Sequence, residues 1–383
     1  MPTAPPPGSP AATGRLSVGS RRWAAVLRPL AVVGLLYVFF LALDLVGLSF
    51  KLFGKGFAEQ LMAGTSDPFV GLFVGILATS LVQSSSTTTS MTVALVAAGA
   101  ISLEGAIPII MGANIGTSVT NTLVSLGSVT RREEFRRAFA GATLHDFFNL
   151  LTVAILFPLE LATGYLARTA AAVERVLEGA GGIELFDPLK TVIRPVAAAI
   201  SGFFGSSGWL TLAAGALLLF AALKLLVDLL KALLTARAES LLDRTLFRSP
   251  LHAIGAGLVI TVMVQSSSIT TSVMVPLVGA GVVTLEQLFP LTVGANLGTT
   301  VTAMLAALAT GNAAAVSVAL AHVLFNLTGT VILYPLPPVR RLPLALARGM
   351  GRLAAERRWL AAVYVLLVFF GIPLTLLFVT GTF

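Results

Sequence analysis

The chain has 383 residues, of which 56% are hydrophobic and 11% are charged. No soluble core could bury so much apolar surface, and apolar stretches long enough to cross ~30 Å of hydrocarbon recur along the chain, so we predict an all-α polytopic membrane protein. The net charge of +8 would suggest a nucleic-acid partner in a soluble protein, but the basic residues lie between apolar stretches, and we expect no nucleic-acid binding. The absence of cysteine excludes disulfides, thiol catalysis and cysteine-ligated metals.

The first 22 residues are rich in proline and small residues, and we predict a disordered tail there. An apolar stretch from Trp23 to Phe50 follows. It is longer than the apolar core of a signal peptide, and no clean small-residue cleavage site comes after it. We therefore expect the first membrane span here rather than a cleaved leader.

The next apolar stretch, residues 69–82, is too short to cross a membrane before it meets the polar run Gln-Ser-Ser-Ser-Thr-Thr-Thr-Ser at residues 83–90. We predict a re-entrant helical hairpin over residues 66–100 with the polar run at its tip. Non-helical backbone at such a depth is tolerated only where protein or a water-filled cavity satisfies it. A half-helix that begins in the serine run points free N–H groups and the positive end of its dipole into the tip, which favours an anion.

A second copy of the tip stands 182 residues later, with Gln-Ser-Ser-Ser at residues 265–268 in a second predicted hairpin, residues 250–283. Without any gap, residues 83–120 and 265–302 share 22 identities in 38 positions, many of them hydroxyl, amide and glycine residues. Serine and threonine in membrane helices often only bond back to their own helix or join two helices. Two in-register copies, each behind a glutamine, instead favour a duplicated binding half-site.

The arginines predict that the two copies have inverted topology. Four arginines lie between residues 131 and 137, whereas the equivalent turn of the second copy, residues 310–312, carries no charge. Six arginines between residues 340 and 358 follow the second copy, whereas the matching region of the first copy, residues 168–194, balances its bases with acids. Arginine-rich loops stay in the cytoplasm, so equivalent loops lie on opposite faces, as in many secondary transporters.

The predicted path makes seven crossings and two re-entrant hairpins in the cell (inner) membrane, with the N-terminus in the cytoplasm and the C-terminus outside. Its segments are the tail at 1–22, transmembrane repeat 1 at 23–165, an extracytoplasmic loop at 166–207, transmembrane repeat 2 at 208–338, and a cytoplasmic basic segment with a final span at 339–383.

Neither tip has a basic residue near it in the sequence: no lysine or arginine occurs at residues 56–130 or 249–339. Hydroxyls and helix dipoles offset little of the cost of dehydrating a dianion, so cations must enter with an anion bound between the tips. Neutral oxygens, which hard cations prefer, are offered by Gln83, Gln265, Asn114, Asn296, Thr120, Thr299 and Thr302. The residues thus predict cation-coupled anion transport and leave the anion open.

Three motifs resemble the type II sodium-dependent phosphate cotransporter family in a bacterial form: the duplicated Gln-Ser-Ser-Ser, the segment 112–122 and the segment 135–149. The resemblance covers residues 23–380 and implies sodium-driven uptake of inorganic phosphate, chiefly the divalent ion. It places sodium at the glutamine and threonine positions, and phosphate at Ser84, Ser85, Ser86, Ser266, Ser267 and Ser268. Animal relatives carry an acidic residue, linked to an additional sodium, that is absent from residues 127–131, so the stoichiometry does not follow.

Other polar residues have simpler interpretations. Ser102 and Thr284 are predicted N-caps, each followed by an acid in the first helical turn. His145 and His322 are expected to bridge helices rather than to carry protons. For Asp146, a place in the site and pairing with a neighbour stay equally open.

We therefore expect a sodium-coupled phosphate symporter with phosphate between the two tips near the bilayer midplane, no cofactor, and sodium as the co-transported ion. Transport of another oxyanion such as sulfate or arsenate, coupling to protons, and a non-transporting scaffold or channel stay open as alternatives. An enzyme is disfavoured, because no group of nucleophile, base and orienting residue and no metal-ligand cluster stands out. The oligomeric state is open, with a homodimer as one option.

Overall fold

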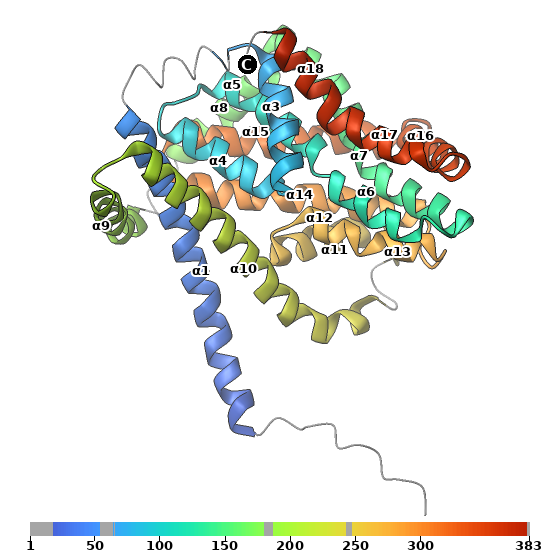
Figure 1. Ribbon diagram of the computed structural model, residues 1–383, viewed down its shortest axis with the longest axis horizontal. Helices are drawn as coiled ribbons and strands as arrows, with labels where there is room; N and C mark the ends of the chain where they lie inside the picture. The colour runs from blue at the N-terminus through green and yellow to red at the C-terminus, as the bar shows by residue number, and fades with distance from the viewer. Residues whose placement is uncertain (1–17, 54–63, 65, 180–186, 243–246, 381–383) are drawn as a thin grey trace, which may run out of the picture.

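The computed structural model describes residues 18–53, 64, 66–179, 187–242 and 247–380, and every regular element in them is a helix (Figure 1). The all-α prediction is therefore confirmed. Of the predicted tail, residues 1–17 lie outside the described part of the chain, and helix α1 (Val18–Phe53) begins at Val18.

Six helical segments among the described residues are long and apolar enough to cross a membrane. They are Leu30–Phe53, Leu103–Ser128, Arg132–Thr163, Leu285–Thr310, Ala313–Leu333 and Trp359–Val379. A multi-span membrane protein is thus confirmed. The seventh predicted crossing, through Leu225, falls on α10 (Gly208–Leu242), which packs along α1 and has its described apolar stretch at Gly208–Leu223.

Each Gln-Ser-Ser-Ser run joins short helices. They are α3 (Pro68–Val82) and α4 (Ser85–Ala97) in the first copy, and α11 (Pro250–Val264), α12 (Ser267–Ser272) and α13 (Met274–Gly279) in the second. Capping residues start both hairpins: Asp67 Oδ1 accepts from Phe69 N at 2.8 Å, and Ser249 Oγ accepts from His252 N at 3.3 Å. The first helix of each has 15 residues, or about 22 Å, less than the ~30 Å hydrocarbon core.

Glycines bring each hairpin against the helix that follows it. A Cβ at Gly75 of α3 or at Gly112 of α5 (Leu103–Gly116) would overlap the backbone of the facing helix. Gly257 of α11 and Gly294 of α14 (Leu285–Thr310) repeat this contact in the second copy. Such close approach maximises van der Waals contact, the main attraction between helices in lipid.

We expect Gly257→Ala to lower the stability of the protein by ~1–3 kcal/mol, because the added methyl group would overlap the carbonyl oxygen of Leu291 on α14. Gly255→Ala is the matched control on the same helix, since a Cβ there meets nothing within 4 Å. Thermal unfolding of the two purified variants in detergent measures the difference. Equal melting temperatures would contradict the role of the close contact.

The helix after the hairpin is continuous in one copy and broken in the other. α14 runs unbroken, whereas α5 ends at Gly116 and α6 (Val119–Ser125) begins beyond the break, before a 3-10 turn at Leu126–Ser128. The predicted N-caps are confirmed: Ser102 Oγ accepts from Gly105 N at 3.1 Å, and Thr284 Oγ1 accepts from Gln287 N at 3.2 Å.

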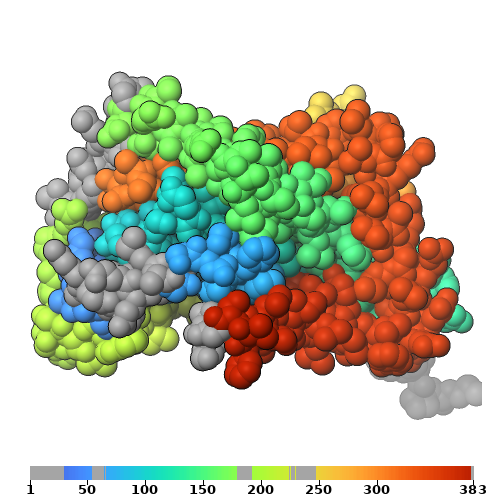
Figure 2. All heavy atoms as spheres, turned by 90° about the horizontal axis from the view of Figure 1, so that it is seen from above, coloured from blue at the N-terminus to red at the C-terminus, as the bar shows by residue number. Residues whose placement is uncertain are grey.

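The remaining helices enclose these hairpins. They are α7 (Arg132–Thr163), α8 (Tyr165–Gly179), α9 (Asp187–Phe203), α15 (Ala313–Leu333), α16 (Pro337–Glu356), α17 (Trp359–Leu366) and α18 (Ile372–Val379), with a π-helical turn at Leu367–Gly371. The predicted loop 166–207 thus contains most of α8 and all of α9, while residues 180–186 lie outside the described part. α16 packs along α7, and Figure 2 shows α7 and α8 (green) beside α16 to α18 (orange to red) on one face.

Candidate ion-binding site

Both tips turn on a glutamine in the left-handed backbone region. The φ angle is 58° at Gln83 and 55° at Gln265, a conformation that costs a non-glycine residue ~1–3 kcal/mol. In each copy the side-chain Nε2 donates to the carbonyl three residues earlier, at Ser80 (2.5 Å) and at Val262 (2.7 Å). The amide therefore caps the end of its own helix and leaves its oxygen for a partner elsewhere.

In both copies that partner is a threonine of the helical segment after the hairpin, α6 in the first copy and α14 in the second. Thr120 Oγ1 donates to Gln83 Oε1 at 2.8 Å, and Thr302 Oγ1 donates to Gln265 Oε1 at 2.5 Å. Four of the seven predicted sodium residues are thus brought together as two equivalent pairs of neutral oxygens. Thr299 Oγ1 instead donates to Ala295 O at 3.2 Å and so bonds back to its own helix.

The first serine of each run caps the helix that it begins. Ser84 Oγ accepts from Thr87 N at 3.2 Å, and Ser266 Oγ accepts from Ile269 N at 3.4 Å. Ser85 and Ser267 follow with buried side chains, and their hydroxyls make no hydrogen bond to any described residue. The first N–H groups of a helix also lack a partner inside it, so each tip offers donors to a ligand.

The third serine of each run contacts the other copy. Ser86 Oγ donates to the carbonyl of Gln265 at 3.1 Å, and Ser268 Oγ donates to the carbonyl of Thr117 at 3.2 Å, at the break between α5 and α6. Both serines are buried. The six residues predicted for phosphate therefore lie on two tips that touch each other.

Asn114 and Asn296 lie in a second polar cluster, which also joins the copies. His145 Nε2 and Asn296 Oδ1 are 2.5 Å apart, and His322 Nε2 and Asn114 Nδ2 are 3.1 Å apart. Because Asn114 corresponds to Asn296 in the repeat, each histidine contacts the asparagine of the other copy. All four side chains are buried, and the histidines bridge helices as expected.

Asn149 completes this cluster. Its Nδ2 donates to the carbonyl of Asn114 at 2.6 Å, and its Oδ1 accepts from Asn296 Nδ2 at 2.7 Å. Asn296 therefore has its oxygen left to accept, which puts the proton of His145 on Nε2. Sequence reasoning did not assign Asn149 to the site, although an asparagine inside an apolar span is a usable signal.

A further hydrogen bond joins this polar cluster to the second tip. Asn121 Nδ2 donates to Thr271 Oγ1 of α12 at 2.9 Å, and it lies 3.5 Å from His145 Nδ1. Neither Asn121 nor Thr271 was predicted as a site residue. Asp146, which the sequence left open, accepts a hydrogen bond from Tyr364 of α17 at 2.9 Å and so pairs with a neighbour.

The two glutamine–threonine pairs differ in exposure. Gln83 is exposed and Thr120 is half-buried, whereas Gln265 is 9% exposed and Thr302 is 2% exposed. One glutamine–threonine pair is therefore open and its equivalent is closed. Separately, a cavity of about 530 Å³ lies at the end of α4 remote from its tip, lined in part by Asp44, Lys51 and Arg194.

These features define a helical membrane protein with two equivalent polar hairpins, which touch at their tips and are each backed by a glutamine–threonine pair. The family described as Na+/Pi-cotransporter matches residues 38–181 and 217–334, and each matched segment contains one tip. The chain belongs to this family, as its resemblance to the type II cotransporters indicates.

Animal relatives are similar over most of the chain. It is 35% identical over 447 aligned residues to Sodium-dependent phosphate transport protein 2B of Homo sapiens. This alignment covers 91% of this chain and 64% of that protein. It is 36% identical over 420 aligned residues to Sodium-dependent phosphate transport protein 2A of Rattus norvegicus. That alignment covers 89% of this chain and 66% of the rat protein. The chain thus spans slightly less than two thirds of the length of these relatives. No solved structure matches the chain.

Proposed function

We propose that the protein is a secondary active symporter that couples sodium entry to the uptake of inorganic phosphate. The hydrogen bond between Ser86 of one tip and Gln265 of the other carries this proposal, because it brings two anion-favouring helix starts to one point. Membership of the Na+/Pi-cotransporter family and the names of the relatives support the choice of ions.

Phosphate would bind between the two serine runs. The hydroxyls of Ser85 and Ser267 have no other described partner, and Ser86 and Ser268 hold the tips in place through backbone carbonyls. Ser84 and Ser266 fix the helix starts, so the N–H groups of the first turns point to the same region. This site binds an anion through hydrogen bonds and dipoles without a basic side chain.

Sodium would supply the missing positive charge. The pairs Gln83–Thr120 and Gln265–Thr302 offer neutral oxygens of the kind that hard cations prefer, and rotation of either threonine hydroxyl would free both oxygens of a pair. Thr299, Asn114 and Asn296 stay candidate ligands in our proposal, through a rearrangement of the bonds that they make now. Sodium is the co-transported ion here, and no cofactor is required.

We infer further that α3–α4 and α11–α13 are re-entrant hairpins of two inverted repeats. The shortness of α3 and α11 supports the first point, and the arginines of 131–137 and 340–358 support the second. These arginine-rich segments would lie on the cytoplasmic side of the inner membrane. The N-terminus would lie on the same side, and the C-terminus would lie outside. The exposed first glutamine–threonine pair and the buried second pair are the kind of asymmetry that alternating access requires.

Uptake of radiolabelled phosphate into proteoliposomes, with and without an inward sodium gradient, tests this function. A symporter accumulates phosphate saturably and only with the gradient. Sulfate or arsenate as competitors test the choice of anion, and a proton gradient without sodium tests the choice of cation. A channel would conduct without saturation or coupling, a scaffold would move nothing, and either outcome would refute the proposal.

We expect Thr302→Val to raise the sodium concentration for half-maximal uptake by roughly ten-fold, because the variant removes one oxygen from the closed pair without changing side-chain shape. Thr292→Val is the matched control: this buried threonine of α14 only bonds back to Leu288 O, at 3.1 Å. Phosphate affinity at saturating sodium should stay near that of the unmodified protein. Equal sodium dependence in the two variants would remove Thr302 from the sodium site.

A further inference from the structure

Four arginines line a pocket between α7, α14 and α16, apart from the serine tips. The pocket has a volume of about 360 Å³, and its lining residues are Arg136, Arg137, Ala140, Leu285, Ala345, Arg348 and Arg352. Gly351 allows α16 to lie directly on α7, since a Cβ at this position would overlap the carbonyl oxygen of Arg136. We call this cavity the arginine pocket.

The positive charge of the arginine pocket is only partly balanced. Arg136 pairs with Glu133 at 2.9 Å while its buried Nε has no partner, and Arg137 Nε donates to a carbonyl oxygen, that of Gly279, at 2.7 Å. Arg352 makes no hydrogen bond or ion pair with any residue that the structure describes. No carboxylate of the described residues lines the pocket, and like charges gathered in this way favour binding of an anion.

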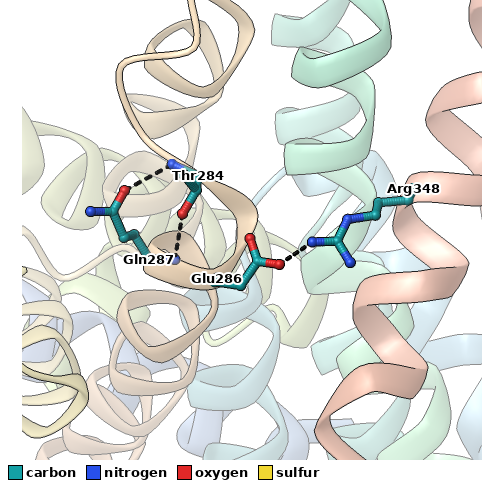
Figure 3. Close-up of polar contacts among 4 residues, drawn as sticks. All are labelled: Thr284, Glu286, Gln287 and Arg348. Atoms are coloured by element: carbon teal, nitrogen blue, oxygen red, sulfur yellow. Dashed lines mark hydrogen bonds and ion pairs between the residues drawn. The ribbon is translucent and has the colours of Figure 1, made fainter.

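The fourth arginine is held by a contact that a ligand can replace. Arg348 pairs with Glu286 in the first turn of α14, where the side chains of Thr284 and Gln287 form a capping box (Figure 3). Both partners of the ion pair are about half exposed, and exposed ion pairs contribute little to stability. An anion with two acceptor oxygens can therefore exchange with Glu286 for the guanidinium of Arg348.

Phosphate is the anion that this arrangement suits. Guanidinium groups bind phosphate oxygens through two parallel hydrogen bonds, and basic pockets between spans on the cytoplasmic side bind phospholipid headgroups. We propose that the arginine pocket binds a phosphate group, either the headgroup phosphate of an anionic lipid or inorganic phosphate. The two ligands share the same chemistry, and the site does not depend on whether the chain transports phosphate.

Occupancy of the arginine pocket would reach the second half-site through Glu286. Glu286 lies in the first turn of α14, the helix that carries Asn296, Thr299 and Thr302. Its equivalent in the first copy, Glu104, makes no ion pair with any described residue. A phosphate that releases Glu286 therefore changes how α16 is joined to the helix that carries these three residues.

The test compares Arg352→Gln and Arg348→Gln with Arg341→Gln, an equal loss of charge at an exposed position of α16 outside the pocket. In one arm, native mass spectrometry counts phosphatidylglycerol and phosphatidylcholine retained by the purified protein. In the other, equilibrium dialysis measures radiolabelled inorganic phosphate on protein that also carries Ser85→Ala and Ser267→Ala. Melting temperatures show that every variant is folded.

We expect the two pocket variants to lose roughly ten-fold in affinity for the phosphate ligand, while Arg341→Gln behaves like the unmodified protein. Loss confined to phosphatidylglycerol identifies a lipid headgroup, and loss confined to dialysed phosphate identifies the free ion. Arg348→Lys should fall between, since it keeps the charge but not the paired hydrogen bonds. If the pocket variants match Arg341→Gln in both arms, the arginine pocket is not a phosphate site.

Discussion

Alanine at Ser85 or Ser267 is expected to weaken phosphate binding by roughly ten- to a hundred-fold for each substitution, because each removes a hydroxyl donor from a charged ligand at a cost of ~1.5–3 kcal/mol. Both serines lie at the first helical position after a tip and are buried as residues, and their hydroxyls make no hydrogen bond within the described residues. The folded protein loses no described contact, so its melting temperature should change little. Equilibrium binding of radiolabelled phosphate in sodium measures the effect.

Ser80→Ala is the matched control for this experiment. Ser80 is buried on α3, its hydroxyl has no partner among the described residues, and its equivalent in the second copy is Val262, so an apolar side chain is compatible with the position. The backbone carbonyl of Ser80, which accepts the hydrogen bond from Gln83 Nε2, is kept in this variant. If Ser85→Ala and Ser267→Ala bind phosphate as well as Ser80→Ala does, the serine tips have a structural role only.

The polar tips could be predicted from the sequence because their features are local. A short apolar stretch before a polar run and serine at a helix start each have a physical meaning that does not depend on the rest of the fold. The repeat then doubles every such signal: Gln83–Thr120 predicts Gln265–Thr302 at the same spacing, and both pairs are present.

The polar cluster behind the tips could not be predicted in the same way. His145 and Asn296 lie in different copies. The 182-residue repeat does not indicate that the histidine of one copy contacts the asparagine of the other. The break between α5 and α6, against the continuous α14, is equally hidden, since the identities run through both segments. Such contacts depend on how the copies dock, which is set by packing over long sequence distances.

The unequal exposure of the two equivalent glutamine–threonine pairs depends on this docking. If the copies are inverted, a conformation that opens the first tip to one side closes the second, and the reverse conformation exchanges their environments. Val82 and Val264 report on this directly, because they occupy equivalent positions just before the two tip glutamines. Val82 is 37% exposed and Val264 is 4% exposed.

We expect Val82→Cys to react with an impermeant thiol reagent in the described conformation and Val264→Cys to be protected, in a chain that has no native cysteine to confuse the result. Changing sodium and phosphate should shift the two reactivities in opposite senses, because ligands that favour one conformation deplete the other. Unfolding experiments on both variants control for local damage to the hairpins. Labelling that is insensitive to both ions, or that changes in the same sense at both positions, would show that the two half-sites do not alternate, and the repeat would then record only the origin of the fold.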